Sequence, residues 1–222
     1  MRADGRYLTD VWTGEAVQFI ERHAAGPFFL HVAYNAPHAP LQAPEEEIAP
    51  FAETGNFNWG VCCVYGMIRR MDEGVARILQ ALREKAIEEN TIVLFTSDNG
   101  PQFGGGGREC TTRFNCGLNG AKGSVYEGGI RVPMVLRWPA GLPAGRLFGG
   151  MVHFCDWFPT LLAAAGARPP RDMTLDGIDV LPLLRGDDGQ VETRRFWQWN
   201  HYTPLATCNA AMREGNWKLV RP

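Results

Sequence analysis

Two apolar runs in the sequence have the pattern of strands that are buried on both faces. Phe28–Ala33 and Ile92–Phe95 are almost continuously apolar, without the polar alternation of a half-exposed strand. Such runs are typical of parallel sheets, which are covered on both sides. A third apolar run, at residues 133–138, predicts another strand. His31 lies inside the first run, where we expect a structural histidine rather than a ligand.

Segments with helical periodicity alternate with these runs. One helix is predicted to begin at Asp10 as its N-cap and to stop at Gly26, and another is predicted over residues 156–166 with Asp156 as its cap. A long amphipathic helix is predicted over residues 61–82. Its apolar stripe contains Val61, Tyr65, Ile68, Val75, Leu79 and Leu82. Asp72 falls on the same stripe, so we expect its carboxylate to be buried and hydrogen-bonded.

The order of these elements predicts an α/β fold, in which a partly parallel mixed sheet is sandwiched by helices. Short strands at 196–199 and 210–212, with a hairpin turn over 212–218, predict the start of a small antiparallel sheet. We therefore divide the chain into a larger α/β unit, 1–190, and the start of a small α+β subdomain, 191–222.

Charge and composition exclude several classes of protein. The chain has 222 residues and a net charge of −2, which gives no electrostatic basis for binding nucleic acid or a membrane surface. No apolar run reaches transmembrane length, and no signal-like segment opens the chain. The six cysteines match no common zinc spacing. Cys110 and Cys116 flank a short loop and could pair in an oxidising compartment, but free thiols explain them equally well.

Polar side chains follow the second apolar run directly. Asp98 and Asn99 come just after Ile92–Phe95, and ligands of α/β sheets bind beyond the carboxyl ends of the strands. A carboxylate beside an amide oxygen suits a hard cation such as Ca²⁺ or Mg²⁺. The sequence Asp-Asn-Gly is also ordinary turn chemistry, so these residues alone leave both interpretations open.

Two further residues carry candidate chemistry in loops. His38 is bracketed by two prolines, which would hold the imidazole stiffly, as a general acid or base requires; a loop histidine facing water is the alternative. Lys122 lies between small residues, so its ammonium group could approach a bound anion, or it is an ordinary surface lysine. Glu127 and Arg131 are four residues apart, and we expect them to brace their loop as an ion pair.

Three motifs together resemble the second half of the catalytic domain of arylsulfatase-type sulfatases, in the alkaline-phosphatase-like superfamily. In chain order they are Tyr34–Pro40, Ser97–Gly100 and Lys122–Pro133. The resemblance implies that Asp98 and Asn99 are metal ligands, normally to Ca²⁺. It also implies that His38 and Lys122 contact the sulfate group and the bridging oxygen of a sulfate ester. The expected substrate is a small-molecule or carbohydrate sulfate ester.

The chain also departs from the family pattern. The nucleophile of the family is a formylglycine made from Cys or Ser in a Cys/Ser-x-Pro/Ala-x-Arg signature, and none of the six cysteines lies in such a context. We therefore expect a C-terminal portion of a sulfatase that is inactive by itself. The resemblance implies that the full-length protein is periplasmic or secreted. The alternatives are a phosphomonoester or phosphonate hydrolase of the same superfamily, or a non-catalytic truncated relative.

Overall fold

The computed structural model describes residues 5–102, 114–187, 194–200 and 207–221. The helices are α1 (Leu8–His23), α2 (Glu45–Ala52), α3 (Trp59–Glu84), α4 (Glu127–Ile130), α5 (Trp157–Ala164) and α6 (Leu181–Arg185), with 3-10 turns at η1 (Glu88–Asn90) and η3 (Phe154–Asp156). The strands are β1 (Val93–Thr96), β2 (Met134–Arg137), β3 (Arg195–Trp199), β4 (Asn209–Glu214) and β5 (Trp217–Arg221). None of the helices in these ranges is both long and apolar enough to cross a membrane.

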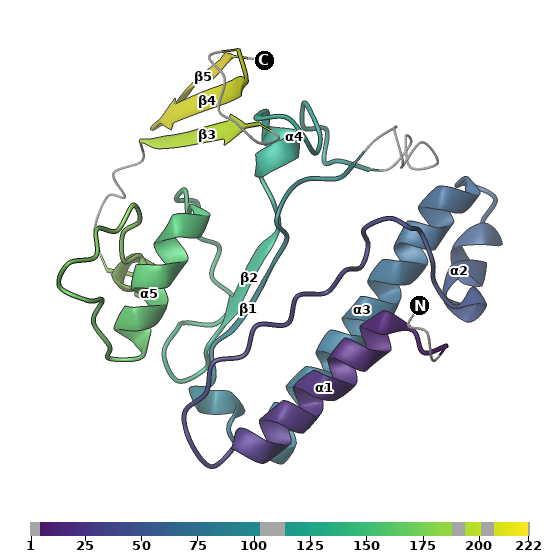
Figure 1. Ribbon diagram of the computed structural model, residues 1–222, viewed down its shortest axis with the longest axis horizontal. Coiled ribbons are helices and arrows are strands. Elements are labelled where there is room, and N and C mark those ends of the chain that lie inside the picture. Colours follow the sequence, from purple (N-terminus) through teal and green to yellow (C-terminus); the bar gives the residue numbers. More distant parts are fainter. Residues whose placement is uncertain (1–4, 103–113, 188–193, 201–206, 222) are drawn as a thin grey trace.

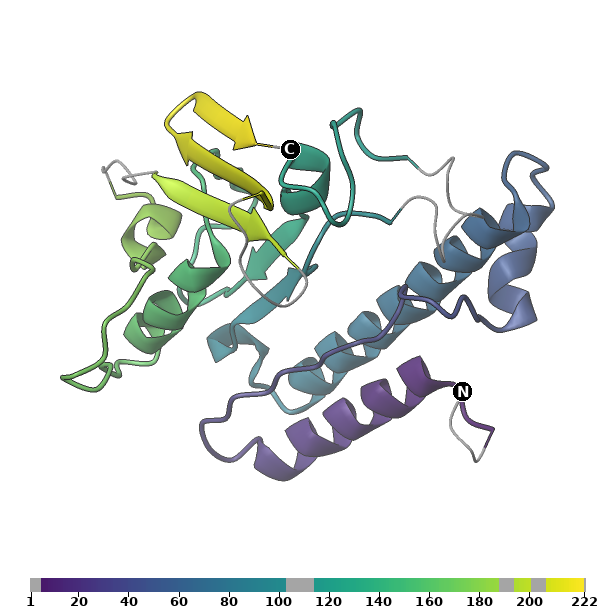
Figure 2. The same ribbon diagram turned by 45° about the horizontal axis from the view of Figure 1, so that its top comes forward.

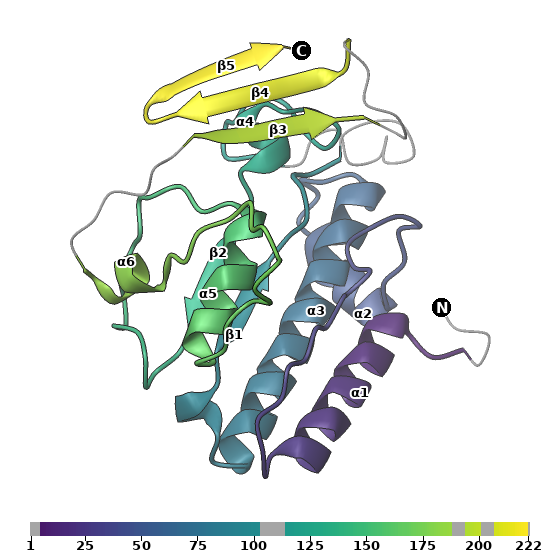
Figure 3. The same cartoon turned by 60° about the vertical axis from the view of Figure 1, so that its left-hand side comes forward.

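The elements form layers around the β1–β2 pair. Helices α1 and α3 lie on one side of this pair and α5 lies on the other, as Figures 1 and 3 show. The sheet made of β3, β4 and β5 lies across one end of the layers, beside α4, and Figure 2 shows the same arrangement from a turned view. The predicted α/β class and the small antiparallel sheet are therefore confirmed.

Helix α3 carries the core that joins α1 and α2. Its N-terminus is capped by the side chain of Asn58, which accepts a hydrogen bond from the Val61 amide at 3.0 Å. The most buried positions of this helix include Val61, Cys62, Cys63, Val64, Met67, Gly74, Ala81 and Leu82. The prediction for Asp72 is wrong, because its side chain is exposed. Asp72 is two residues from the buried Gly74, about 200° around the helix, so it points away from the packed face.

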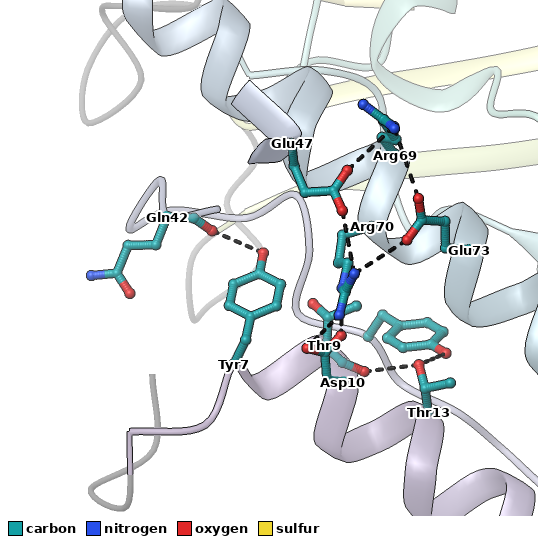
Figure 4. Close-up of polar contacts among 10 residues, drawn as sticks. Tyr7, Thr9, Asp10, Thr13, Gln42, Glu47, Arg69, Arg70 and Glu73 are labelled. Carbon is teal, nitrogen blue, oxygen red and sulfur yellow. Dashed lines mark hydrogen bonds and ion pairs between the residues drawn. The ribbon is translucent and has the colours of Figure 1, made fainter. Parts of the chain in front are cut away.

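A cluster of ion pairs ties the three N-terminal helices together (Figure 4). Arg70 of α3 donates to both carboxylate oxygens of Asp10 in α1, at 2.7 and 3.0 Å, and to Glu47 of α2 at 3.3 Å. The hydrogen bonds to Asp10 raise the pKa of Arg70 above its ordinary value, against the opposing effect of burial. The N-cap of α1 is Tyr7 and not Asp10 as predicted, because Asp10 lies in the first turn of the helix.

The apolar run before Asp98 forms a strand, but its pairing and its burial differ from those predicted. β1 and β2 pair antiparallel, from Val93 opposite Arg137 to Thr96 opposite Met134. The prediction of a strand buried on both faces of a parallel sheet is wrong for the described residues, because they pair only antiparallel and Phe95 is 36% exposed.

The first apolar run is extended but is not a strand. Among the described residues it has no hydrogen-bonded neighbouring strand, so the strand prediction for Phe28–Ala33 is wrong. Phe28 and Leu30 pack on the core between α1 and α3, whereas Phe29 is 78% exposed. His31 is also exposed, so it is not the structural histidine that we expected. One face of the segment packs and the other does not, as in a half-buried strand.

The small sheet has the order β3-β4-β5, with antiparallel pairing throughout. The Nζ atom of Lys218 in β5 lies 2.7 Å from Oε1 of Glu127 in α4, which attaches the sheet to that helix. Glu127 thus pairs across the fold, and not with Arg131 as the spacing had suggested.

The boundary predicted between residues 190 and 191 lies outside the described residues, as does Cys110.

Candidate functional site

Two loops meet where β1 ends, and backbone hydrogen bonds hold them together. The amide of Gly100 donates to the carbonyl oxygen of Gly129 at 2.8 Å, and the amide of Lys122 donates to the carbonyl oxygen of Pro101 at 2.9 Å. These bonds place the turn that contains Asp98 and Asn99 against the loop that contains Lys122. The structure therefore brings the backbone of these two segments together, and the convergence of the side chains of Asp98, Asn99 and Lys122 on one ligand stays a prediction.

Glycines allow this close approach. A side chain at Gly100 would meet the backbone carbonyl of Gly128, and one at Gly129 would meet the carbonyl oxygens of Ser124 and Ala121. Each of these obstacles is backbone, which cannot rotate aside as a side chain can. The predicted site thus depends on the absence of side chains where the two loops touch.

Asp98 and Asn99 lie in the wall of a pocket of about 360 Å³. Other lining residues are Gly123, Ser124 and Val125 from the loop after Lys122, His153 and Phe154 near η3, and Phe196, Trp197, Gln198 and Trp199 of β3. Asp98 is exposed and Asn99 is half-buried. Both residues follow β1 closely in the chain, and their role as metal ligands stays a prediction.

His38 is positioned by its own loop. The amide of His38 donates to the carbonyl oxygen of Asn35 at 2.8 Å, and Nδ1 lies 2.7 Å from the carbonyl oxygen of Ala39. Ala36 beside it is buried against α2 and α3. A carbonyl oxygen only accepts, so Nδ1 carries a proton and Nε2 is left for a ligand. His38 does not line the pocket with Asp98, and its convergence with that residue stays a prediction.

Sequence reasoning missed the polar cluster behind the pocket. Asp156 is fully buried, and its carboxylate accepts from the amides of His153 and Ile178 at 2.8 and 3.0 Å and from Nη2 of Arg195 at 2.7 Å. Asp156 was predicted as a helix cap, and it does stand at the start of α5, but its side chain makes no capping bond there. His153 is three residues away and forms a capping box with Asp156, but Ile178 and Arg195 are 22 and 39 residues away, so no local pattern marks those two partners.

His153 lines the pocket, and its tautomer follows from its contacts. The amide of Cys155 donates to Nδ1 of His153 at 3.3 Å, and the thiol sulfur of Cys155 lies 3.1 Å from the same nitrogen. Because Nδ1 accepts, the ring proton of the neutral form is on Nε2. Burial lowers the pKa of His153; the Asp156 carboxylate opposes this effect and the Arg195 guanidinium adds to it. His153 is therefore a neutral Nε2–H donor at neutral pH.

Two residues of the pocket have side chains of the type that binds a hard cation. Carboxylate and amide oxygens are the ligands that Ca²⁺ prefers, and Asp98 and Asn99 offer both side by side in the pocket wall. Ca²⁺ takes roughly six to eight oxygen ligands, so these two residues are part of a ligand set. Within the described ranges, no group of three or more His, Cys, Asp or Glu side chains is arranged to hold a metal ion.

Two family models match the chain. The model described as Sulfatase matches residues 2–167, and the model described as N-sulphoglucosamine sulphohydrolase, C-terminal, matches residues 121–221. The N-acetylgalactosamine-6-sulfatase of Canis lupus familiaris is 38% identical to the chain over 208 residues, which are 90% of this chain and 36% of that protein. The steryl-sulfatase of Mus musculus is 36% identical over 214 residues, 95% of this chain and 31% of that protein.

Solved structures share the fold. Ps i-CgsB in complex with k-i-k-neocarrahexaose superposes with a TM-score of 0.86 at 34% identity, over 98% of this chain and 46% of that chain. The phosphonate monoester hydrolase of Agrobacterium radiobacter has a TM-score of 0.69 at 22% identity, over 96% of this chain and 52% of that chain, and shows the fold alone. The predicted alkaline-phosphatase-like architecture is thereby confirmed.

The chain spans about a third of the length of the curated relatives named above. The sequence motifs, the loops joined at the end of β1 and the family model that covers most of the chain agree with one another. The chain belongs to the sulfatase family.

Proposed function

We propose that this chain contributes metal-binding and sulfate-binding residues to the active site of a sulfuric ester hydrolase. One observation carries the proposal: the turn with Asp98 and Asn99 is hydrogen-bonded to the loop with Lys122, and both loops border one pocket. A carboxylate, an amide oxygen and an ammonium group are the groups that a cation and a sulfate would need. Membership of the sulfatase family supports the same reaction.

Lys122 acts on the charge of the substrate. The non-bridging oxygens of a sulfate ester are negative, and the leaving oxygen gains charge as the S–O bond breaks. An ammonium group held in place beside these oxygens stabilises that charge more in the transition state than in the ground state. Asp98 and Asn99 would hold a divalent cation, Ca²⁺ by resemblance to the family, and that cation would supply positive charge for the sulfate oxygens.

His38 supplies a proton. Its Nδ1–H donates to the carbonyl oxygen of Ala39, so Nε2 is the nitrogen that gains and loses the catalytic proton. In the protonated ring, Nε2–H donates to the departing alcohol oxygen, which leaves as a neutral alcohol. The bonded Nδ1 keeps the ring oriented through this exchange.

The proposed substrate is a sulfated carbohydrate. This class is supported by a relative named for a sulfated aminosugar and by a solved relative in complex with a carrahexaose. A phosphonate hydrolase shares the fold at low identity, so hydrolysis of a phosphorus ester is the less favoured alternative. From the family resemblance, we propose that the full-length protein is periplasmic or secreted.

The test uses the protein expressed from its complete gene. Hydrolysis of 4-nitrophenyl sulfate and of 4-nitrophenyl phosphate is measured for the wild type and for His38→Ala and Lys122→Ala. We expect sulfate hydrolysis to dominate and kcat to fall by at least about 100-fold in each variant. The matched controls are His31→Ala and Lys85→Ala, which replace an exposed histidine and an exposed lysine elsewhere on the chain. Loss of activity in the controls, or full activity in both site variants, would contradict the proposal.

A further inference from the structure

The pocket has a second group of lining residues that the proposed chemistry does not use. They come from β3 and from the turn before α5, and they are aromatic or amide side chains together with His153. Asp98 and Asn99 line the pocket from the turn after β1. The small sheet therefore lines the same pocket with a different surface. The described side chains that line this surface include no lysine, arginine or carboxylate, which points to the organic part of a ligand.

Trp199 lies next to the proposed sulfate-binding loop. Its indole ring is 3.8 to 3.9 Å from the position that a side chain at Gly123 would occupy, so the ring packs over the residue that follows Lys122. Trp199 is 37% exposed, which leaves part of an aromatic surface open on the pocket side of β3. A flat apolar surface beside an anion site suits a ring that carries the anionic group.

The neighbouring side chains hold this surface in place. The ring of Trp197 is 5.4 Å from the ring of His153, and the ammonium group of Lys218 lies 5.7 Å from the centre of the Trp197 ring. Lys218 is fixed in turn by its ion pair with Glu127. The Trp197 part of the aromatic wall is therefore tied to α4 and to the turn before α5.

His153 adds a hydrogen-bond donor to the same wall. Its Nδ1 accepts from the amide of Cys155, which leaves Nε2–H as the donor of a neutral ring. A donor beside an aromatic face is the combination that recognises a pyranose, since a sugar ring has an apolar C–H face and hydroxyl oxygens at its edge. A simple alkyl or aryl group offers the face without the hydroxyl groups.

We propose that His153 and Trp199 bind the sugar ring of a sulfated pyranose, with Trp199 stacking on the ring and His153 donating to one of its oxygens. The assignment rests on the proposed function for the sulfate end of the site. It makes both residues positioning residues that select the alcohol portion of the ester, not residues that take part in bond cleavage.

The test measures binding by calorimetry to the protein expressed from its complete gene. The probes are galactose 6-sulfate, N-acetylglucosamine 6-sulfate, N-acetylgalactosamine 6-sulfate and, as the probe without a ring, inorganic sulfate. Trp199→Ala should weaken binding of the sugar sulfate that the wild type prefers by about three- to tenfold, and Trp199→Tyr should keep most of it. His153→Ala should weaken the same binding by about three- to tenfold, and His153→Gln, which keeps a donor, should do so less. Binding of inorganic sulfate should not change in any variant.

The control is Trp217→Ala, which removes an indole that is 85% exposed and does not line the pocket. If Trp199→Ala fails to fold, the comparison of Trp199→Tyr with Trp199→Leu replaces it. The inference is overturned if the wild type binds none of the sugar sulfates, or if both site variants bind them as the wild type does. Activity on 4-nitrophenyl sulfate in the same preparation then shows whether the proposed function survives. If the sugar sulfates bind through Trp199 but are not hydrolysed, the assignment of Trp199 to sugar binding stands and the proposed sulfatase function is contradicted.

Discussion

At the scale of single residues, the buried pair of Asp156 and Arg195 connects the pocket to the helical layer. Asp156 is 0% exposed and the side chain of Arg195 is 11% exposed, so both charges are largely removed from water. Such a pair is tolerated because the remaining lone pairs of the carboxylate are used by the amides of His153 and Ile178. One carboxylate thereby positions the pocket histidine, the start of α5 and the first residue of β3.

We expect Asp156→Ala to destabilise the protein strongly. Removing one partner of a buried ion pair leaves the other charge uncompensated, which costs about 3–5 kcal/mol. Urea unfolding of the wild type and the variant measures the change, and Asp172→Ala is the control because Asp172 is exposed. A loss of less than about 1 kcal/mol would mean that Arg195 finds other partners. Adding Arg195→Met to Asp156→Ala should recover part of the stability, since no buried charge remains.

At the scale of elements, the short helix α4 determines how closely the two site loops approach. The amide of Gly128 donates to the carbonyl oxygen of Asn119 at 2.7 Å, and a side chain at Gly128 would meet the carbonyl oxygen of Gly120. The helix therefore begins on backbone that has no room for a Cβ atom. Lys122 and Gly123 lie in the same loop, so the position of the ammonium group depends on this contact.

We expect Gly128→Ala to displace the loop. Forcing a methyl group against fixed backbone typically costs about 1–3 kcal/mol, and the displaced Lys122 should lower kcat on 4-nitrophenyl sulfate as well. Gly149→Ala is the matched control, because nothing lies within 4 Å of a side chain added there. Its unfolding free energy and kcat should stay close to those of the wild type. Equal behaviour of the two variants would show that the loop contact is not needed.

At the scale of the whole molecule, the chain leaves much apolar surface uncovered. Its accessible surface is 14272 Å², against about 10,000 Å² for a compact monomer of its mass. Phe95 and Val135 are paired across β1 and β2, and they are 36% and 60% exposed on that sheet. Phe29 in the neighbouring extended segment is 78% exposed. Surfaces of this kind in an isolated chain favour association.

We expect the 222-residue chain, expressed by itself, to be inactive and prone to aggregate. Asp98 and Asn99 supply two or three of the roughly six to eight oxygen ligands of Ca²⁺, so calorimetry should give a Kd of about 1 mM or weaker. The sequence contains no formylglycine signature, so hydrolysis of 4-nitrophenyl sulfate should not exceed background. A tight one-to-one calcium isotherm, or turnover that His38→Ala abolishes, would mean that this chain contains a complete site.

The sequence by itself determined several of the helices and strands and the candidate chemistry that follows β1. Helical periodicity located α3 to within two residues at each end, because the spacing of apolar residues is a local property of the chain. The apolar runs before Asp98 and after Arg131 formed the strands β1 and β2. The order of the motifs around His38, Asp98 and Lys122 was enough to indicate the family that the comparisons support.

Only the tertiary structure decided which faces and which distant groups meet. Asp72 was assigned to the packed face of α3, but α1 and α2 cover a different face of that helix. Which face of a helix is buried depends on where the neighbouring helices pack. Glu127 had a suitable partner four residues away and pairs instead with Lys218, 91 residues on. The wall that contains His153 and Trp199 is formed by the turn before α5 together with β3, which border the same pocket as the turn after β1. Contacts between residues so far apart in the chain follow from the packing of whole elements, which no local pattern encodes.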